Sequence, residues 1–406
     1  MATLCGQTSS IFLAKPNPNH RTTRQKTITT VQCVHRPPRK APPSTEPSPI
    51  FTSLKTFAPA TVANLGPGFD FLGCAVDGIG DTVTLRVDPA VRPGFVSISS
   101  VESADSAASK KLGCDARWNC AGIGAISTMR MIGVRSVGLS IALHKGLPLG
   151  SGLGSSAASA AAAAVAVNEL FGGPLSAKEL IVAGLESEAK VSGYHADNIA
   201  PAIVGGFVLV RGYDPLDVMP LRFPSGAPLF FVLVSPEFEA PTKKMRAALP
   251  KEVGMKAHVA NCSQAAAIAA AVLLGDARLL GSALSADGIV EPTRMPLIPG
   301  MAAVKSAALE AGAFGCTISG AGPTAVAVTD DEEKGKEIGA RMVEAFMEEG
   351  QLKASASVRM LDRAGAREVS TEDWLSWARA MLFQSSVVSS LGAAEVASSV
   401  EVACRC

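Results

Sequence analysis

A glycine-rich segment at residues 146–158 constrains the fold of this chain more than any other feature. It reads Gly-Leu-Pro-Leu-Gly-Ser-Gly-Leu-Gly-Ser-Ser-Ala-Ala, follows an apolar run at 138–143, and continues into an alanine-rich stretch that extends to residue 171. The apolar run predicts a strand, and the alanine-rich stretch predicts a helix. Glycines let a backbone approach an anion closely, and the N–H groups of a helix N-terminus attract negative charge. The segment therefore predicts a strand, a loop and a helix that together bind phosphate groups.

Two other phosphate-binding patterns fit this segment less well. A P-loop needs a Lys directly before the Ser or Thr that starts the helix, and no Lys stands there. The dinucleotide pattern matches at Gly152, Gly154 and Ala157, but it requires a second parallel strand after the helix, and the next segment, 177–190, has helical spacing. A nicotinamide oxidoreductase stays open as an alternative, as does a loop that only turns the chain.

Composition excludes several other classes of protein. The chain has 406 residues, 48% of them apolar and 18% charged, which predicts a folded protein of two packed domains or one large one. The net charge of +1 offers no basic surface for nucleic acid. The 9 Cys include no C-x-x-C pair. The longest smooth apolar stretch, 157–167, is shorter than the roughly 20 residues that cross a bilayer, so no membrane span is expected.

The two ends of the chain differ in composition from the rest. Residues 1–50 carry seven basic residues and one acidic residue, are rich in Ser and Thr, and contain two Pro-Pro pairs. This composition is typical of an organelle transit peptide, with an ordinary leader as the alternative, and a chain starting near Ser53 is expected to be active. The last segment, 371–406, begins with a pattern for a short capped helix, and its role is not predicted.

Between these ends, extended and helical patterns alternate. Extended runs lie at 82–87, 138–143, 207–210, 229–234 and 324–328, and helical patterns at 119–132, 155–171, 177–190, 259–274 and 301–311. A turn-rich stretch at 211–220 is the predicted boundary between two lobes.

Three motifs in this order resemble those of the GHMP kinases. They are Pro-Ala-Thr-Val-Ala-Asn-Leu-Gly-Pro-Gly-Phe-Asp at 59–70, the glycine segment from residue 148, and Thr-Ile-Ser-Gly-Ala-Gly-Pro-Thr at 317–324. The resemblance covers roughly residues 54–370. It implies an α+β fold of two domains, with mixed sheets and packed helices: an ATP-binding domain at 51–218 and a ferredoxin-like C-terminal domain at 219–370.

Within that family, further segments resemble the members that phosphorylate homoserine. They are Gly-Tyr-His-Ala-Asp-Asn-Ile-Ala-Pro-Ala-Ile-Val-Gly-Gly at 193–206, Pro-Thr-Lys-Lys-Met-Arg at 241–246 and Glu-Pro-Thr-Arg-Met-Pro at 291–296. The resemblance implies a substrate site made of Asn64, Asp70, Thr242, Arg246 and Arg294. This set suits L-homoserine, which offers an ammonium for a carboxylate, a carboxylate for two guanidiniums, and one hydroxyl to be phosphorylated.

The resemblance also implies the nucleotide and metal sites. ATP would bind at Pro148, Gly150, Gly152, Leu153, Gly154, Ser155, Ser156, Ala157, Gly320 and Gly322. Mg²⁺ would bind at Ser156 and Glu188, with Glu186 as the other candidate for the acidic ligand. The two acids are two residues apart, so they cannot share one helix face.

Phosphoryl transfer depends mainly on positioning and on neutralising the charge of the transferred group. The expected roles are that Asn198 orients the substrate hydroxyl, that His195 faces the substrate, and that Asp197 is a candidate base. A GHMP kinase for another small alcohol, such as mevalonate or shikimate, and a silent family member that only binds ATP stay open as alternatives. The leader and the resemblance together predict a plastid stromal enzyme, and a homodimer is possible.

Overall fold

The structure is a computed structural model that describes residues 46–103, 112–191 and 193–372. The predicted leader up to residue 45 and the predicted tail from residue 373 lie outside the described residues.

The first sheet has seven strands, in the order β11-β1-β2-β4-β3, with β5 paired to β2 and β6 paired to β5. Their bounds are β1 (Ser53–Ala63), β2 (Leu72–Val87), β3 (Val96–Ser103), β4 (Leu139–Lys145), β5 (Phe207–Tyr213), β6 (Leu216–Leu221) and β11 (Arg367–Glu372). All neighbours are antiparallel except β3 and β4. The chain thus contributes its last described strand to the sheet that contains its first.

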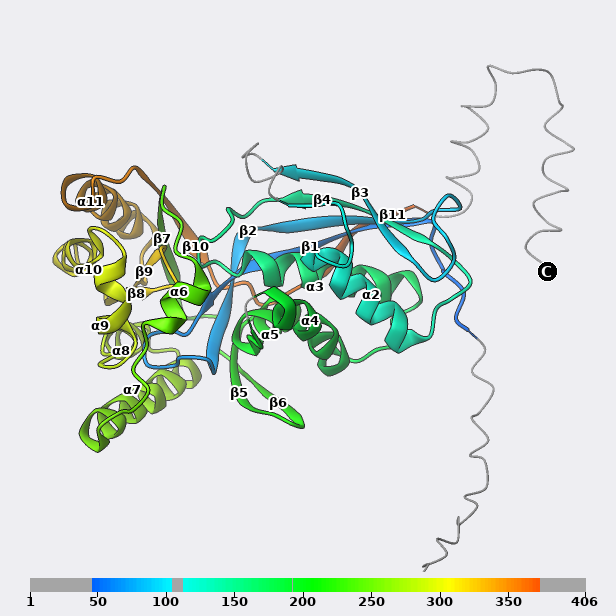
Figure 1. Cartoon of the computed structure of the whole chain (residues 1–406). Helices are drawn as coiled ribbons and strands as arrows, with labels where there is room; N and C mark the ends of the chain where they lie inside the picture. The colour runs from blue at the N-terminus through cyan, green and yellow to red at the C-terminus, as the bar shows by residue number, and fades with distance from the viewer. Residues whose placement is uncertain (1–45, 104–111, 192, 373–406) are drawn as a thin grey trace, which may run out of the picture. The chain divides into compact units, whose positions relative to one another are not determined.

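Helices gather on one face of this sheet (Figure 1). They are α2 (Cys120–Ile132), α3 (Ser155–Leu170), α4 (Ala177–Val191) and α5 (Ala196–Val204). Helix α3 packs on β1 and β2, and its alanines are fully buried. Small side chains also let α2 approach α3 closely: a Cβ on Gly124 of α2 would lie 2.7 Å from the carbonyl oxygen of Ala160. The alanine-rich run is therefore a buried core helix. It is followed by α4 and not by a parallel strand, which excludes the dinucleotide-binding topology.

The second sheet is antiparallel, with the order β10-β7-β9-β8. Its strands are β7 (Phe230–Pro236), β8 (Gly315–Ile318), β9 (Ala325–Thr329) and β10 (Ala354–Met360), and α10 (Met301–Glu310) and α11 (Glu332–Gly350) pack on it. This strand order and the intervening helices give the ferredoxin-like arrangement. Alternate residues of β7 face two cores: Val232 and Val234 pack with α10 and α11, whereas Phe231 and Leu233 join the core of the first sheet.

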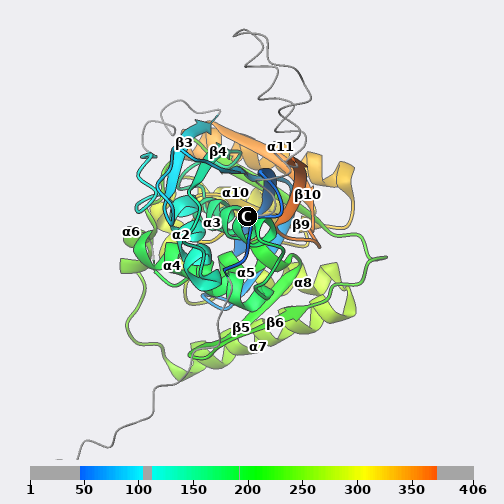
Figure 2. The same ribbon diagram turned by 90° about the vertical axis from the view of Figure 1, so that its right-hand side faces the viewer.

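The remaining elements lie along the chain between β7 and α10. They are α6 (Thr242–Ala247), α7 (Met255–Leu274), α8 (Ala277–Leu284), α9 (Glu291–Arg294) and the 3₁₀ helix η1 (Met295–Leu297). Helix α7 packs against α8 and beside the β5–β6 hairpin (Figure 2).

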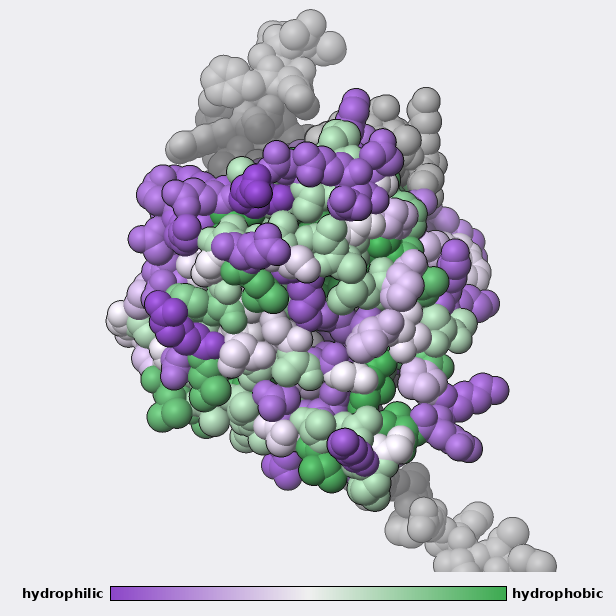
Figure 3. Space-filling view, turned by 90° about the vertical axis from the view of Figure 1, so that its left-hand side faces the viewer, coloured by the Kyte–Doolittle hydropathy of each residue, from purple (hydrophilic) through white to green (hydrophobic). Residues whose placement is uncertain are grey.

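Helix α7 was not expected to resemble a membrane span. Among the described residues it is long and apolar enough to cross a membrane by length and composition, with a mean hydropathy of 1.5 and 22% of that window buried. Met255, Val259 and Leu274 are exposed on it. Figure 3, which views this end of the molecule, shows hydrophobic residues among polar ones along the lower edge. Asn261 of the same helix is buried and donates to the carboxylate of Asp287, so α7 is tied into the fold.

Two predicted boundaries differ from the structure. The turn within 211–220 is the β5–β6 hairpin inside the first sheet, so the chain leaves that sheet only after Leu221. The chain later returns to the first sheet through β11, part of which falls within the predicted C-terminal domain. At the other end, the predicted leader overlaps the fold, because the Ile50 N–H donates to the Leu170 carbonyl and the Glu46 carboxylate accepts from the N–H groups of Arg135 and Ser136.

Candidate active site

The three sequence motifs meet where the two sheets adjoin. The Thr61 N–H donates to the Leu153 carbonyl at 3.1 Å, which joins the first motif to the second. The Ser319 hydroxyl donates to the Gly152 carbonyl at 2.8 Å, which joins the third motif to the second. The Gly320 N–H donates to the carbonyl of Ala63, at the end of β1.

A cavity of about 430 Å³ opens at this junction. The predicted site residues that line it are Asn64, Asp70, Gly150, Gly152, Gly154, Ser155, Ser156, Glu188, His195, Asp197, Asn198, Thr242, Arg246, Arg294 and Gly320. The predicted nucleotide, metal and substrate residues therefore share one cavity.

Four predicted residues do not line this cavity. Leu153 and Ala157 are buried in the hydrophobic core, and Pro148 lines a neighbouring cavity of about 490 Å³. Gly322, in the loop of the third motif, packs against Ile298, because a Cβ there would come within 2.6 Å of that side chain. These four positions support the loops and do not face the cavity.

The glycine loop adopts a backbone that other residues rarely adopt. Gly150, Gly152 and Gly154 all have positive φ, and Gly154 is the N-cap of α3 without a side-chain capping bond. A Cβ on Gly154 would lie 2.0 Å from Thr61 Oγ1. The loop and the N-terminus of α3 thus present backbone to the cavity, which suits a phosphate chain.

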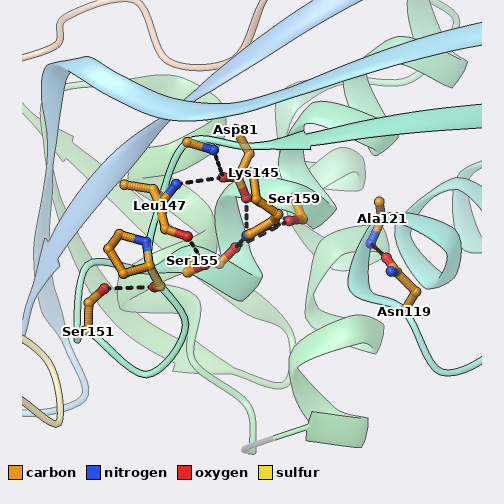
Figure 4. Close-up of polar contacts among 10 residues, drawn as sticks. Asp81, Asn119, Ala121, Lys145, Leu147, Ser151, Ser155 and Ser159 are labelled. Carbon is orange, nitrogen blue, oxygen red and sulfur yellow. Dashed lines mark hydrogen bonds and ion pairs between the residues drawn. The ribbon is translucent and has the colours of Figure 1, made fainter. Parts of the chain in front are cut away.

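A buried ion pair lies beneath this loop (Figure 4). The carboxylate of Asp81 pairs with the ammonium of Lys145, and it also accepts from the hydroxyl of Ser159 at 2.6 Å. Lys145 and Ser159 both line the cavity, as does Asn119, the N-cap of α2. No motif in the sequence marked Asp81 or Lys145, although a charged residue directly before a glycine loop is an available signal.

Opposite charges face each other where the predicted substrate residues line the cavity. The guanidinium of Arg246 donates to both carboxylate oxygens of Asp70, at 2.9 and 2.7 Å. The same guanidinium lies 3.3 Å from Nδ1 of His195. Side-chain hydrogen bonding to Asp70 is the main cause that raises the pKa of Arg246. The residues expected to receive a substrate ammonium and carboxylate are therefore paired with each other.

Both predicted substrate arginines lie over the ring of Phe69. The guanidinium carbons of Arg246 and Arg294 lie 5.1 and 5.0 Å from the centre of its ring. Stacking of this kind holds both guanidinium planes in place.

Arg294 is buried and reaches the glycine loop of the third motif. Its side chain donates to the Gly320 carbonyl at 2.8 Å, and no partner is found for its buried Nε among the described residues. Burial, followed by the nearby Arg246, lowers the pKa of Arg294 to about 10, so it remains a cation at neutral pH. A network behind it fixes α9, in which the Glu291 carboxylate pairs with Lys305 and accepts from Thr317.

The two predicted asparagines are held by hydrogen bonds to neighbouring motifs. Asn64 donates to the Gly320 carbonyl at 2.7 Å and accepts from the Asp70 N–H at 3.0 Å. Asn198 accepts from the Thr61 hydroxyl at 3.1 Å. An amide carries two donors and two acceptor lone pairs, so each retains capacity for a ligand.

Asp197 is a buried acid of the cavity whose pKa is raised. It is 1% exposed, and its Oδ1 has no hydrogen-bond partner in the described part of the chain. Burial, followed by the charge of Asp70, raises the pKa of Asp197 to about 7. A carboxyl group with a pKa near neutrality is suited to exchange protons.

The structure separates the two candidate metal ligands on α4. Glu188 is buried and lines the cavity with Ser156, whereas Glu186 pairs with Arg130 on the surface. Asp70, His195 and Asp197 also lie close enough to hold a cation, but the Arg246 guanidinium already lies against Asp70. Ser156 and Glu188 are the better fit for Mg²⁺, which takes oxygen ligands.

Several cavity residues were not predicted from the sequence. They are Phe69, Leu112, Asn119, Cys120, Leu143, Lys145, Leu149, Ser151, Ser159, Pro241, Lys243 and Ala321. Burial, followed by the nearby charge of Glu188, raises the pKa of Cys120 to about 11, which disfavours the reactive thiolate form at neutral pH.

Comparisons with known proteins agree with this geometry. The model of the GHMP kinases N-terminal domain matches residues 122–206, and that of the GHMP kinases C-terminal domain matches residues 267–349. The crystal structure of a homoserine kinase from Cytophaga hutchinsonii superposes with a TM-score of 0.72 at 41% identity, covering 78% of this chain and 98% of that one.

Two curated relatives are also named homoserine kinase. A homoserine kinase of Arabidopsis thaliana is 66% identical over 373 residues, which are 91% of this chain and 99% of that protein. A homoserine kinase of Chloroherpeton thalassium is 41% identical over 318 residues, which are 77% of this chain and 98% of that protein. The chain belongs to the homoserine kinases, a branch of the GHMP kinase family.

Proposed function

We propose that this chain transfers the γ-phosphoryl group of ATP to the hydroxyl of L-homoserine and forms O-phospho-L-homoserine, an intermediate of threonine biosynthesis. The observation that carries the proposal is the facing pair of Asp70 and Arg246 in the same cavity as the two glycine loops. An amino acid is a zwitterion, so its ammonium and carboxylate can replace the two halves of this ion pair. Mevalonate and shikimate have no ammonium to offer Asp70.

The nucleotide phosphates would lie along the glycine loop at residues 150–156. The N–H groups there and the N-terminus of α3 would hold negative charge without any change of conformation. The Arg294 guanidinium would receive the substrate carboxylate together with Arg246, while its bond to Gly320 keeps the third loop beside the substrate.

Asn198 and Asp197 would act on the hydroxyl of the substrate. Asn198, fixed by Thr61, orients the hydroxyl, and Asp197 Oδ1 accepts its proton as the bond to phosphorus forms. His195, at the N-terminus of α5, contacts the same Arg246 nitrogen as Asp70 and helps to hold this guanidinium in place.

Mg²⁺ would be held by the Ser156 hydroxyl and the Glu188 carboxylate, both of which line the cavity. When bound, the ion supplies positive charge that offsets the charge of the phosphates. The other residues named above position the acceptor and move its proton.

The cellular location and the partners are further parts of this proposal. The basic, Ser- and Thr-rich composition of residues 1–50 and the similarity to a plant protein support the plastid stroma. We expect no nucleic-acid or membrane partner.

A coupled assay of ADP release tests the proposal. The chain is supplied with ATP, Mg²⁺ and either L-homoserine, mevalonate, shikimate or galactose. We expect kcat/KM to be highest for L-homoserine. A higher value for any of the other three would refute the substrate, and ATP binding without turnover of any would refute the activity.

A further inference from the structure

Asp81 belongs to none of the motifs, yet its carboxylate is buried beneath the glycine loop (Figure 4). It lies on β2, where Thr82 pairs with His144 of β4, so that Asp81 lies beside Lys145 at the end of β4. Removing a carboxylate from water is costly unless hydrogen bonds and an opposite charge replace the water. The partners of Asp81 therefore indicate what it does.

One carboxylate oxygen of Asp81 holds the start of the loop. Oδ1 accepts the N–H of Gly146 at 3.1 Å and the N–H of Leu147 at 3.3 Å. These are the first two residues after β4. A Cβ on Gly146 would lie 2.1 Å from the Gly80 carbonyl oxygen, so the loop starts in close contact with β2.

The other oxygen holds the end of the loop. Oδ2 accepts from the Ser159 hydroxyl at 2.6 Å and from the Lys145 ammonium. That ammonium also donates to the Ser155 carbonyl at 2.7 Å and to Ser159 Oγ at 2.9 Å. Ser155 and Ser159 lie one turn apart at the N-terminal end of α3, where the loop ends.

We propose that Asp81 is a positioning residue that clamps both ends of the glycine loop, so that the loop is preorganised for the phosphates of a nucleotide. The inference rests on the proposed function, because it takes a nucleoside phosphate as the ligand of this loop. The two ends of the loop are fixed by one side chain. Without the Asp81 side chain, the nucleotide would have to order the loop when it binds. The free energy spent on ordering the loop would lower the affinity.

Lys145 makes this arrangement compatible with an anionic ligand. An isolated carboxylate beneath the loop would repel phosphate, whereas the paired ammonium cancels its charge. All three ammonium protons have acceptors in Asp81, Ser155 and Ser159. The Asp81 and Lys145 pair therefore positions the loop without adding net negative charge to the cavity.

Three variants separate this role from a general contribution to stability. Asp81→Asn keeps an oxygen for Gly146 and Leu147 but cannot accept from Lys145. Ser159→Ala removes one contact to Asp81 without changing any charge. The matched control is Thr56→Val: Thr56 is also buried and its hydroxyl donates to the Ala162 carbonyl of α3 at 2.8 Å, but it does not contact the loop.

The measurements are the Kd for ADP by calorimetry, the Tm, and the KM for ATP and for homoserine. We expect a loss of ADP affinity of about 10- to 100-fold for Asp81→Asn and about 2- to 10-fold for Ser159→Ala. The KM for homoserine should stay within about twofold of wild type in Ser159→Ala, since no contact to the substrate end changes. Thr56→Val should lower Tm and leave ADP affinity unchanged.

Wild-type binding of ADP and phosphorylation of homoserine test the proposed function independently of the clamp. If the wild type binds ADP and phosphorylates homoserine, and Ser159→Ala binds ADP as tightly as the wild type, the clamp is refuted. This holds even if Asp81→Asn fails to fold. A loss of ADP affinity in Thr56→Val as large as in Ser159→Ala would also refute it, since affinity would then follow stability.

Discussion

Arg294 touches the substrate end of the cavity and the third glycine loop at once, so its replacement should affect both. Arg294→Lys keeps the charge but loses the planar fork and the stacking on Phe69. Charge-assisted hydrogen bonds contribute roughly 1.5–3 kcal/mol, which corresponds to about a 10- to 150-fold loss in kcat/KM for homoserine. The KM for ATP should rise to a smaller extent, because the Gly320 carbonyl loses a donor.

Arg363→Lys is the control for this substitution. Arg363 also donates to backbone carbonyls and lies over an aromatic ring, that of Phe223, but it does not line the cavity. Its kinetic constants should match those of the wild type. Equal losses for ATP and homoserine in Arg294→Lys would assign Arg294 to the phosphate loops alone.

The raised pKa of Asp197 predicts a pH dependence of the rate. As the proposed base, Asp197 must be ionised to accept a proton, so kcat/KM should fall about tenfold per pH unit below a pKa of about 7. In Asp197→Asn this acidic limb should disappear along with most of the rate. An acidic limb that is unchanged in the variant would show that another group titrates.

The same group should give a pH-dependent stability that needs no substrate. A raised pKa means that the folded protein binds the Asp197 proton more tightly than the unfolded chain does. The stabilisation from this proton is complete below the pKa of Asp197 in the unfolded chain, about 3.9, and is lost as pH rises through its pKa in the folded protein, about 7. The Tm of the wild type should therefore fall relative to that of Asp197→Asn between pH 4 and pH 8. A constant difference in Tm over this range would contradict the raised pKa.

At the scale of elements, the contact between the two glycine loops should be needed for nucleotide binding. A Cβ on Gly152 would lie 2.4 Å from the carbonyl oxygen of Ser319, so Gly152→Ala should push the loops apart and raise the Kd for ADP. Gly172→Ala is a matched control, because φ is +84° there against +82° at Gly152, and nothing lies within 4 Å of its Cβ.

Both alanine variants carry a similar backbone strain, about 1–2 kcal/mol for a left-handed residue. Thermal melting should therefore show a loss of Tm in both variants, larger in Gly152→Ala because its Cβ also meets the Ser319 carbonyl, whereas calorimetry with ADP should show a loss of affinity in Gly152→Ala alone. Equal affinities would show that the loops do not need to touch.

The elements with strong patterns were predictable from the sequence. Helix α3 and its loop were predicted because alanine and glycine composition act locally, and the strands at 229–234 and 324–328 because they are continuously apolar. Helix α11 was not predicted, because many of its residues are charged and exposed and only a narrow row of residues on one face is buried. Strand β11 was not predicted either, because it is polar and depends on pairing with β1, which is distant in sequence.

The same contrast applies to the site. Residues within the motifs could be assigned to one site because the motifs resemble those of the GHMP kinases. Asp81 belongs to no motif, so it could not be assigned in this way. Its role depends on the register between β2 and β4, which brings it to Lys145, and no local pattern encodes that register.

At the scale of the whole molecule, the described fold begins before Ser53. A chain starting at Glu46 keeps the contacts of Glu46 with residues 135 and 136, and the bond from Ile50 to Leu170. A chain starting at Ser53 loses them, together with the Thr52 carbonyl that accepts from Val87. We expect its Tm to fall by about 2–4 °C for each kcal/mol lost. Identical melting curves for the two chains would show that residues 46–52 contribute nothing.

The pairing of β11 with β1 has a consequence for the order in which the molecule can assemble. During synthesis β1 emerges early, but its edge stays open until the last described strand has been made, with Ser53 opposite Glu372. The nucleotide-binding half therefore cannot complete its sheet ahead of the C-terminal half. Such distant pairings slow folding and leave a strand edge exposed meanwhile. A chaperone that shields this edge would act on the nascent nucleotide-binding half for as long as the ribosome is still translating the other half.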